Sequence, residues 1–342
     1  MEDFSKLEVS GSQMKVIFTG KNFDRGLDAG DRFTILQMAQ TMGAIRVDST
    51  DATANLCICV DYWPKERRLL QHLHRQNIPL FLIKQEPPVI LPEHASANPH
   101  KLFTGVYTRG VAASDNTLRF PNSWEIPSEK WSSSKRKRRF IAISADKWSA
   151  MQGELYSLRR QIYTSTDLLD LYGRDWSMKP LQKSIMLMKE IGLVVKFGKM
   201  PLLPDLPLHL RSPVSYLGTV AKKTEVMSSY DYSLVIENSA DYMSEKLMDA
   251  LLAGTLPVYV GPEVDKFGIP PEFTIQVPPE ERLIKLAMKE ALQRDTARHR
   301  EALWDWLSSD STKELWHSKP SNSDLLQRIF QDYEDWRDST VK

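Results

Sequence analysis

The chain has 342 residues, a length at which two domains are the usual organisation. Its apolar share of 42% and charged share of 26% are ordinary for a folded protein, which excludes disorder of the whole chain. The formal net charge is only +1, and this disfavours a nucleic-acid binder, because that class usually carries a strong basic excess.

The first half of the chain alternates between short apolar runs and longer amphipathic stretches. The apolar runs at residues 14–20, 56–60 and 78–83 predict strands, and the apolar spacing at residues 33–39 and 66–76 predicts helices between them. Strands that alternate with helices are typical of a parallel sheet with helices on its faces. This half is therefore expected to form an α/β domain.

Neither a secretion signal nor a membrane span is predicted. Residues 1–13 are polar and lack an apolar core, and no run of about 18 apolar residues occurs. We therefore expect a protein of the cytoplasm, or one that at most lies on a membrane surface. Cys57 and Cys59 fall within a predicted buried strand without other ligands nearby, so we expect core thiols rather than a metal site or a disulfide framework.

The alternation lapses over residues 121–139, and this segment is the candidate linker. It ends in the basic run KRKRR at residues 135–139. Such a run can bind nucleic acid or face an anionic lipid headgroup or sugar carrier. Because the rest of the chain has no basic excess, we interpret the run as part of a solvated linker and expect no nucleic-acid partner.

The second half repeats the alternation. Apolar runs predict strands at residues 140–144, 233–236 and 256–260, and residues 154–163 have the pattern of a helix. The tail, residues 280–337, is expected to be mostly helical, with its tryptophans serving packing. A second α/β domain therefore follows the linker.

The most informative segment, residues 232–264, predicts a strand, a helix that begins near Asp241, and a second strand. On that helix Tyr242, Glu245 and Lys246 would share one face near its start. Ligands of open parallel sheets bind at the carboxyl ends of the strands, and a helix start there attracts phosphate. Lys246 could neutralise a diphosphate, and Glu245 could accept hydrogen bonds from two ribose hydroxyls. The alternative is a solvated ion pair on the helix surface.

The residue order in this segment resembles the signature of glycosyltransferase family 10, the α-1,3/1,4-fucosyltransferases. The similarity lies in Glu237-Asn238-Ser239, Asp241-Tyr242, Glu245-Lys246, Ala253-Gly254-Thr255 and Pro257-Val258. The resemblance, which covers about residues 80–330, implies that Asn238, Tyr242, Glu245 and Lys246 contact a nucleotide sugar.

The same resemblance implies an α/β fold of the GT-B type, with two Rossmann-like domains facing a cleft. Residues 1–135 would form the acceptor-side domain. Residues 136–342, including the helical tail, would form the domain that binds the nucleotide sugar. No membrane anchor like that of the animal members is predicted, so we expect a member similar to the soluble bacterial type.

Two further elements match the family. In the run ELYSLRR at residues 154–160, the family's diphosphate-clamping arginine falls on Arg159, with Arg160 as the alternative register. The simpler interpretation is an arginine on a solvated helix face. In the run KQEPP, Glu86 follows a predicted strand at its carboxyl end and resembles the family's proposed base, although such a triplet alone is more often only a loop.

Together these elements imply an inverting transfer of fucose from GDP-fucose to a sugar hydroxyl of a glycan or lipid-linked acceptor. Glu86 would take the hydroxyl proton, and Arg159 and Lys246 would stabilise the departing GDP. Should Glu86 not be the base, Asp28 and Asp31 are the alternatives. No Asp-x-Asp motif stands at a predicted strand end, so we expect no obligatory metal or other cofactor.

Three other functions stay open at this point. The first is a transferase of the same fold that uses another nucleotide sugar, because nothing in the sequence identifies the base. The second is a non-catalytic carbohydrate-binding relative. The third, a nucleic-acid binder, rests on residues 135–139 alone.

Overall fold

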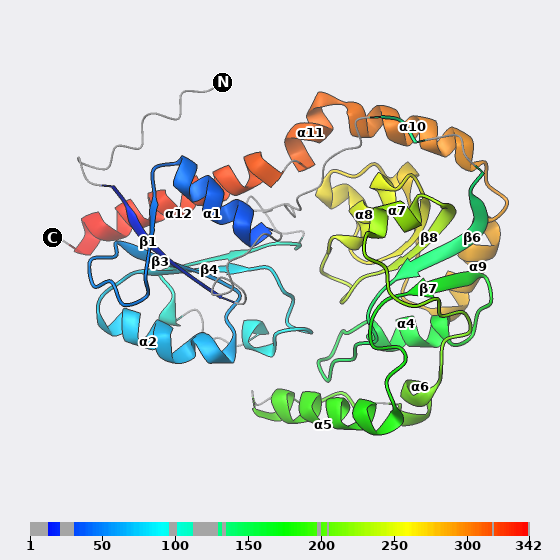
Figure 1. Cartoon of the computed structure of the whole chain (residues 1–342), viewed down its shortest axis with the longest axis horizontal. Coiled ribbons are helices and arrows are strands. Elements are labelled where there is room, and N and C mark those ends of the chain that lie inside the picture. Colours follow the sequence, from blue (N-terminus) through cyan, green and yellow to red (C-terminus); the bar gives the residue numbers. More distant parts are fainter. Residues whose placement is uncertain are drawn as a thin grey trace. The chain divides into compact units, whose positions relative to one another are not determined.

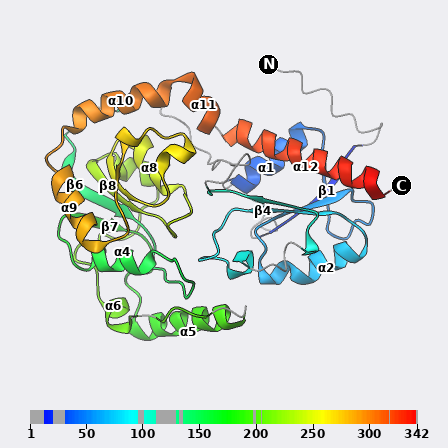
Figure 2. The same cartoon turned by 180° about the vertical axis from the view of Figure 1, so that it is seen from behind.

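The computed structural model describes residues 13–20, 31–95, 101–111, 129–131, 135–196, 200–203, 205–316 and 318–340. The chain divides into two compact units: the first is Met1–Glu125 together with Glu314–Lys342, and the second is Ile126–Lys313. Figures 1 and 2 show that each unit is built on one sheet with helices on both faces.

The first unit contains a parallel sheet of five strands in the order β2-β1-β3-β4-β5. The strands are β1 (Lys15–Gly20), β2 (Ile45–Val47), β3 (Leu56–Val60), β4 (Leu80–Lys84) and β5 (Gly105–Thr108). The described helices of this unit are α1 (Asp31–Thr41), η3 (Pro64–Glu66), α2 (Arg67–Arg75), η4 (Pro92–Ala95) and α12 (Ser318–Thr340). The predicted strands and helices of this half are confirmed.

The two faces of this sheet bury different side chains, because successive residues of a strand point to opposite sides. Val16 and Phe18 face α1 and α12, whereas Ile17 faces α2. Cys57 and Cys59 lie on the α2 face, fully buried, as core thiols.

The second unit repeats this plan with the strand order β10-β9-β8-β6-β7, again all parallel. Its strands are β6 (Lys137–Ile143), β7 (Leu169–Tyr172), β8 (Tyr230–Ile236), β9 (Leu256–Val260) and β10 (Ile275–Gln276). The described helices are α4 (Tyr156–Tyr163), α5 (Pro180–Lys196), α6 (Leu206–Leu210), α7 (Lys223–Met227), α8 (Lys246–Leu252), η5 (Val264–Phe267), η6 (Pro271–Phe273), α9 (Glu281–Ala291) and α10 (Thr296–Ser308). The boundary between the two units falls within α11 (Asp310–Trp316). Helices α4 and α9 cover one face of the sheet, and α7 and α8 the other.

In both sheets the first strand of the unit lies between the second and the third. In each sheet the chain therefore first adds a strand on one side of its first strand (β1 or β6) and then a strand on the other side. In parallel sheets, ligands bind in the crevice at the carboxyl ends of the strands where the strand order reverses in this way. In the second unit this position lies between β6 and β8.

The C-terminal helix corrects the expected domain division. The tail was expected to stay with the second domain, but α12 packs against α1 of the first unit. The cause is an apolar stripe on α12 that needs a hydrophobic partner and is buried in the core of the first unit. Its members are Leu325, Leu326, Ile329, Phe330 and Tyr333. The hydroxyl of Tyr107 on β5 donates a hydrogen bond to Asp332 of the same helix.

The basic run at residues 135–139 also differs from its expectation, because β6 begins within it. Arg136 is buried and donates to the carbonyls of Tyr230, Ala253 and Gly254, and Arg139 pairs with Asp170 at 2.6 Å. Its arginines therefore join β6 to neighbouring elements. The interpretation as a solvated linker is wrong for this part, while residues 121–128 lie outside the described residues.

Within the described ranges, no helix combines the length and the apolar character that crossing a bilayer requires.

Candidate functional site

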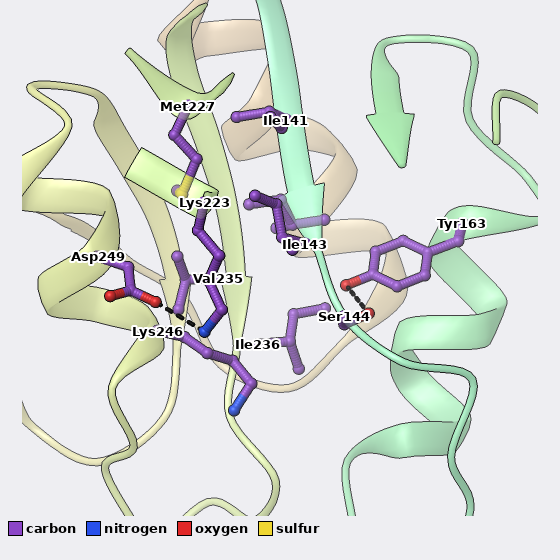
Figure 3. A pocket seen from close by; sticks show the side chains of 11 residues that line it. Ile141, Ile143, Ser144, Tyr163, Lys223, Met227, Val235, Ile236, Lys246 and Asp249 are labelled. Carbon is purple, nitrogen blue, oxygen red and sulfur yellow. Dashed lines mark hydrogen bonds and ion pairs between the residues drawn. The ribbon is translucent and has the colours of Figure 1, made fainter. Parts of the chain in front are cut away.

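A shallow pocket lies at the carboxyl edge of the second sheet, beside the ends of β6 and β8 (Figure 3). Strands β6 and β8 contribute apolar side chains, and helices α7 and α8 contribute charged ones. The lining residues are Ile141, Ile143, Ser144, Tyr163, Lys223, Met227, Leu234, Val235, Ile236, Lys246 and Asp249. The pocket thus occupies the position that the strand order marks for ligands.

The backbone of the turn after β8 is paired with neighbouring segments, and the helix that follows starts later than predicted. Ser239 makes antiparallel bridges to Glu154 and to Tyr242, which occupies backbone groups that a helical turn would need. Helix α8 consequently begins at Lys246, and the prediction of a helix from Asp241 is wrong. Tyr242 does not share a helix face with Lys246; it lies in the turn and is 4% exposed.

Arg159 and Lys246 converge on one side-chain oxygen, that of Asn238. The Arg159 guanidinium donates from Nη2 to Asn238 Oδ1 at 2.9 Å and from Nε to the Ile236 carbonyl at 2.9 Å. The Lys246 ammonium donates to the same Oδ1 at 3.4 Å and to Ser244 Oγ at 2.7 Å. Three of the residues selected from the sequence are therefore brought together at the end of β8.

The buried carboxylate of Glu237 lies next to Lys246 and Ser244. Glu237 is fully buried, accepts a hydrogen bond from the Ser244 hydroxyl, and has the Lys246 ammonium 3.8 Å from its Oε2. Burial raises the pKa of Glu237, while Lys246 and the Ser244 hydroxyl act to lower it. Burial and Glu237 together also raise the pKa of Tyr259 on the neighbouring strand β9.

Glu245 belongs to a second charged group at the pocket wall. The Lys223 ammonium lies 3.2 Å from Glu245 Oε1 and 2.9 Å from Asp249 Oδ2. Burial acts to raise the pKa of Glu245, but Lys246 and Lys223 outweigh it and hold the pKa at about 2. Glu245 is therefore ionised at neutral pH. Lys223 was not selected from the sequence, since it lies outside the signature, 22 residues before Glu245, and only a Lys-Lys pair marks its position.

The two arginines of α4 have different surroundings. Arg160 is buried in a separate cluster, where it pairs with Asp146 and stacks over the Trp176 ring at 4.8 Å. Lys183 shares the same carboxylate, with its Nζ 2.8 Å from Asp146 Oδ2. Arg159 alone reaches Asn238, while its guanidinium rests 4.9 Å from the Tyr156 ring.

Glu86 lies in the first unit, two residues beyond the carboxyl end of β4, and is half-buried. The loop that carries it is held through its backbone. The N–H groups of Gln85 and Glu86 donate to Asp61 Oδ1 at 2.8 and 3.0 Å, and the Glu86 carbonyl lies 2.7 Å from His94 Nδ1.

The hydrogen bonds around this loop hold the His94 ring in one tautomer. Its Nε2 accepts from the Tyr62 N–H at 3.2 Å, so Nδ1 carries the proton that is donated to Glu86. Burial lowers the pKa of His94, which keeps the ring neutral. Asp61, fully buried and with a φ of 60°, follows β3 directly. Asp28 and the side chain of Asp31 lie outside the described residues.

Neither a scan of protein-family models nor a sequence search of curated proteins returns a match. Among solved structures, an α1,3-fucosyltransferase aligns over 95% of this chain and 92% of its own, with 15% identity and a TM-score of 0.54. An α1,3-fucosyltransferase with GDP-fucose aligns over 96% and 93%, with 13% identity and a TM-score of 0.51. HepE of Anabaena, in complex with UDP and glucose, aligns over 93% and 100%, with 10% identity and a TM-score of 0.56.

At these identities the similarity is one of fold. The chain has the α/β fold of the GT-B glycosyltransferases, with two parallel sheets flanked by helices.

Proposed function

We propose that this chain is an inverting glycosyltransferase that moves fucose from GDP-fucose to a sugar hydroxyl of a glycan or lipid-linked acceptor. The observation that carries the proposal is the convergence of Arg159 and Lys246 on Asn238, beside the pocket at the end of β8. A diphosphate needs concentrated positive charge and hydrogen-bond donors, and this edge of the sheet offers both.

In the proposed complex Lys246 neutralises the diphosphate. Arg159 holds the Asn238 side chain in place through its hydrogen bond to Oδ1 and adds positive charge near the diphosphate. Glu245 has a second carboxylate oxygen besides the one that Lys223 approaches, so a ribose hydroxyl can donate to it. Tyr242 is the least exposed of the four residues assigned to the nucleotide sugar. In the proposed complex it contacts the nucleotide sugar from the turn after β8.

Glu86 supplies the base in this proposal. It removes the proton from the acceptor hydroxyl while that oxygen forms the bond to the anomeric carbon and the bond from this carbon to GDP breaks. The leaving GDP is stabilised electrostatically by Lys246 and Arg159.

A panel of nucleotide sugars tests the donor. GDP-fucose and GDP are expected to raise the melting temperature, because a ligand at about 100 times its Kd stabilises a protein by about 2.7 kcal/mol. UDP-glucose and UDP-galactose at equal concentration are expected to give smaller shifts. A larger shift with a UDP-sugar would reject the fucosyl donor.

The second candidate function is transfer from a uridine nucleotide sugar. It is favoured by the fold similarity to HepE in complex with UDP and glucose, whose TM-score is as high as that of the fucosyltransferases. The pocket residues provide charge for a diphosphate, which both donor classes contain. The same panel therefore decides between the two candidates.

Transfer is expected to persist when divalent ions are chelated. The reason is that Lys246, Arg159 and Lys223 place positive charge where a metal would otherwise stabilise the diphosphate. The measurement is turnover in EDTA, compared with turnover in added manganese. Complete loss in EDTA with recovery in manganese would show that a metal is required.

A further inference from the structure

Helix α5 buries one face and exposes a second apolar face to solvent. Leu187 and Val194 are buried, at 5% and 0% exposure, and fix the helix to the second unit. Lys183 adds the ion pair to Asp146 on the same inner side. In Figures 1 and 2 the helix lies beyond α4 and α6, away from the sheet of its unit. The orientation of its outer face is therefore set by the inner contacts.

The outer face carries four apolar side chains that form one stripe. They are Leu181, Ile185, Met188 and Val195, with exposures of 72%, 48%, 66% and 55%. At 3.6 residues per turn their spacing places them within about 80° of the helix circumference. The chain beyond the helix exposes two more apolar side chains, Met200 and Leu203, at 86% and 75%. Isolated exposed apolar residues are ordinary, but a contiguous stripe of this kind marks an interaction surface.

Positive charge is concentrated around the stripe. Apart from Lys183, which pairs with Asp146 on the inner side, residues 179–217 hold five lysines and arginines against two acidic residues, a net charge of +3, whereas the whole chain has +1. Lys189 and Lys196 are exposed, and their helical positions lie at one border of the stripe. Lys179 and Arg211 are exposed in the same region. The surface thus combines an apolar stripe with a basic border.

We propose that this face of α5 docks on an anionic lipid surface. The stripe would enter the boundary between headgroups and acyl chains, and the lysines at its border would meet the negative headgroups. Charge complementarity favours lipid over a second apolar protein face, which would leave the lysines unpaired. The docking does not depend on the identity of the donor. It would hold the protein where a lipid-linked acceptor is presented.

Vesicle co-sedimentation of the full chain tests the proposal. We expect binding to vesicles of phosphatidylcholine with phosphatidylglycerol, and much weaker binding to phosphatidylcholine alone. Each lysine near an anionic surface contributes roughly a fivefold gain in partitioning. Lys189→Gln together with Lys196→Gln should therefore weaken binding roughly thirty-fold. Lys289→Gln, an exposed lysine of α9, is the matched control and should bind as wild type.

The apolar arm uses Leu181→Ser, Met188→Ser and Val195→Ser combined. The melting temperature should change little, because exposed side chains contribute little to the fold. Vesicle binding should be lost, whereas Leu286→Ser, at an apolar site 51% exposed on α9, should retain it. Wild-type binding to neither vesicle would overturn the proposal. So would undiminished binding of the triple variant, or a dimer that the triple variant converts to a monomer without any vesicle binding.

Discussion

Glu86→Gln is expected to lower turnover by about 10²–10⁴ while leaving donor affinity nearly unchanged. Gln has the size of Glu but cannot accept a proton as a base. The loop should keep its structure, because the hydrogen bonds that hold it involve the backbone of Gln85 and Glu86, with Asp61 and His94 as partners. Steady-state turnover and equilibrium titration with GDP-fucose measure the two effects separately.

Glu272→Gln is the matched control, since it makes the same chemical change at an exposed position of η6. Its turnover should equal that of wild type. Retained turnover in Glu86→Gln would remove Glu86 from the mechanism and direct attention to Asp28 and Asp31. Loss of folding or of donor binding would show instead that Glu86 has a structural role.

Lys246→Met is expected to weaken donor binding about 10- to 100-fold, because a hydrogen bond to a charged group contributes about 1.5–3 kcal/mol. It should also destabilise the fold. The variant leaves the carboxylate of Glu237, which is fully buried, without the ammonium that lies 3.8 Å away. Breaking a buried ion pair in this way typically costs about 3–5 kcal/mol. Calorimetric titration and denaturant unfolding provide the two measurements.

The loss of stability in Lys246→Met should depend on pH. Burial already raises the pKa of Glu237 above its ordinary value of 4.5, and removal of the ammonium raises it further. Below pH 4.5 both the folded and the unfolded chain hold the proton, so the penalty disappears. As the pH rises, the unfolded chain ionises first, and stability falls until the pH passes the folded pKa.

A double variant separates the two roles of Lys246. Glu237→Gln combined with Lys246→Met removes the buried charge, and the Gln carbonyl can still accept from the Ser244 hydroxyl. The double variant should therefore be more stable at neutral pH than Lys246→Met, yet bind the donor no better. Unchanged donor affinity in both variants would mean that Lys246 serves only to neutralise Glu237.

The sequence predicted the elements whose signals are local. Alternating apolar runs identified the strands of both sheets, because burial on two faces requires long apolar runs in parallel strands. Part of the signature proved to have a structural explanation. Gly254 has a φ of 69°, and a Cβ there would lie 2.7 Å from the Trp131 ring. Thr255 is buried, and its hydroxyl oxygen lies 2.8 Å from Ser233 Oγ and 2.9 Å from the carbonyl oxygen of Ala250, to one of which it donates.

Features that depend on partners distant in sequence could not be predicted. Arg136 is bonded to carbonyls about 100 residues away, so the basic run could not be distinguished from a linker. Lys223 meets Glu245 only after β8 and the following turn have formed. The apolar stripe of α12 predicts a helix with a partner, but not that the partner belongs to the first unit.

The most direct measurement is a crystal structure of the protein with saturating GDP. We expect the nucleotide in the pocket between β6 and β8, with its diphosphate in ion-pair contact with the Lys246 ammonium and its ribose beside Glu245. Nucleotide bound elsewhere on the chain, or in the pocket without any contact to Lys246, would contradict the proposed donor site.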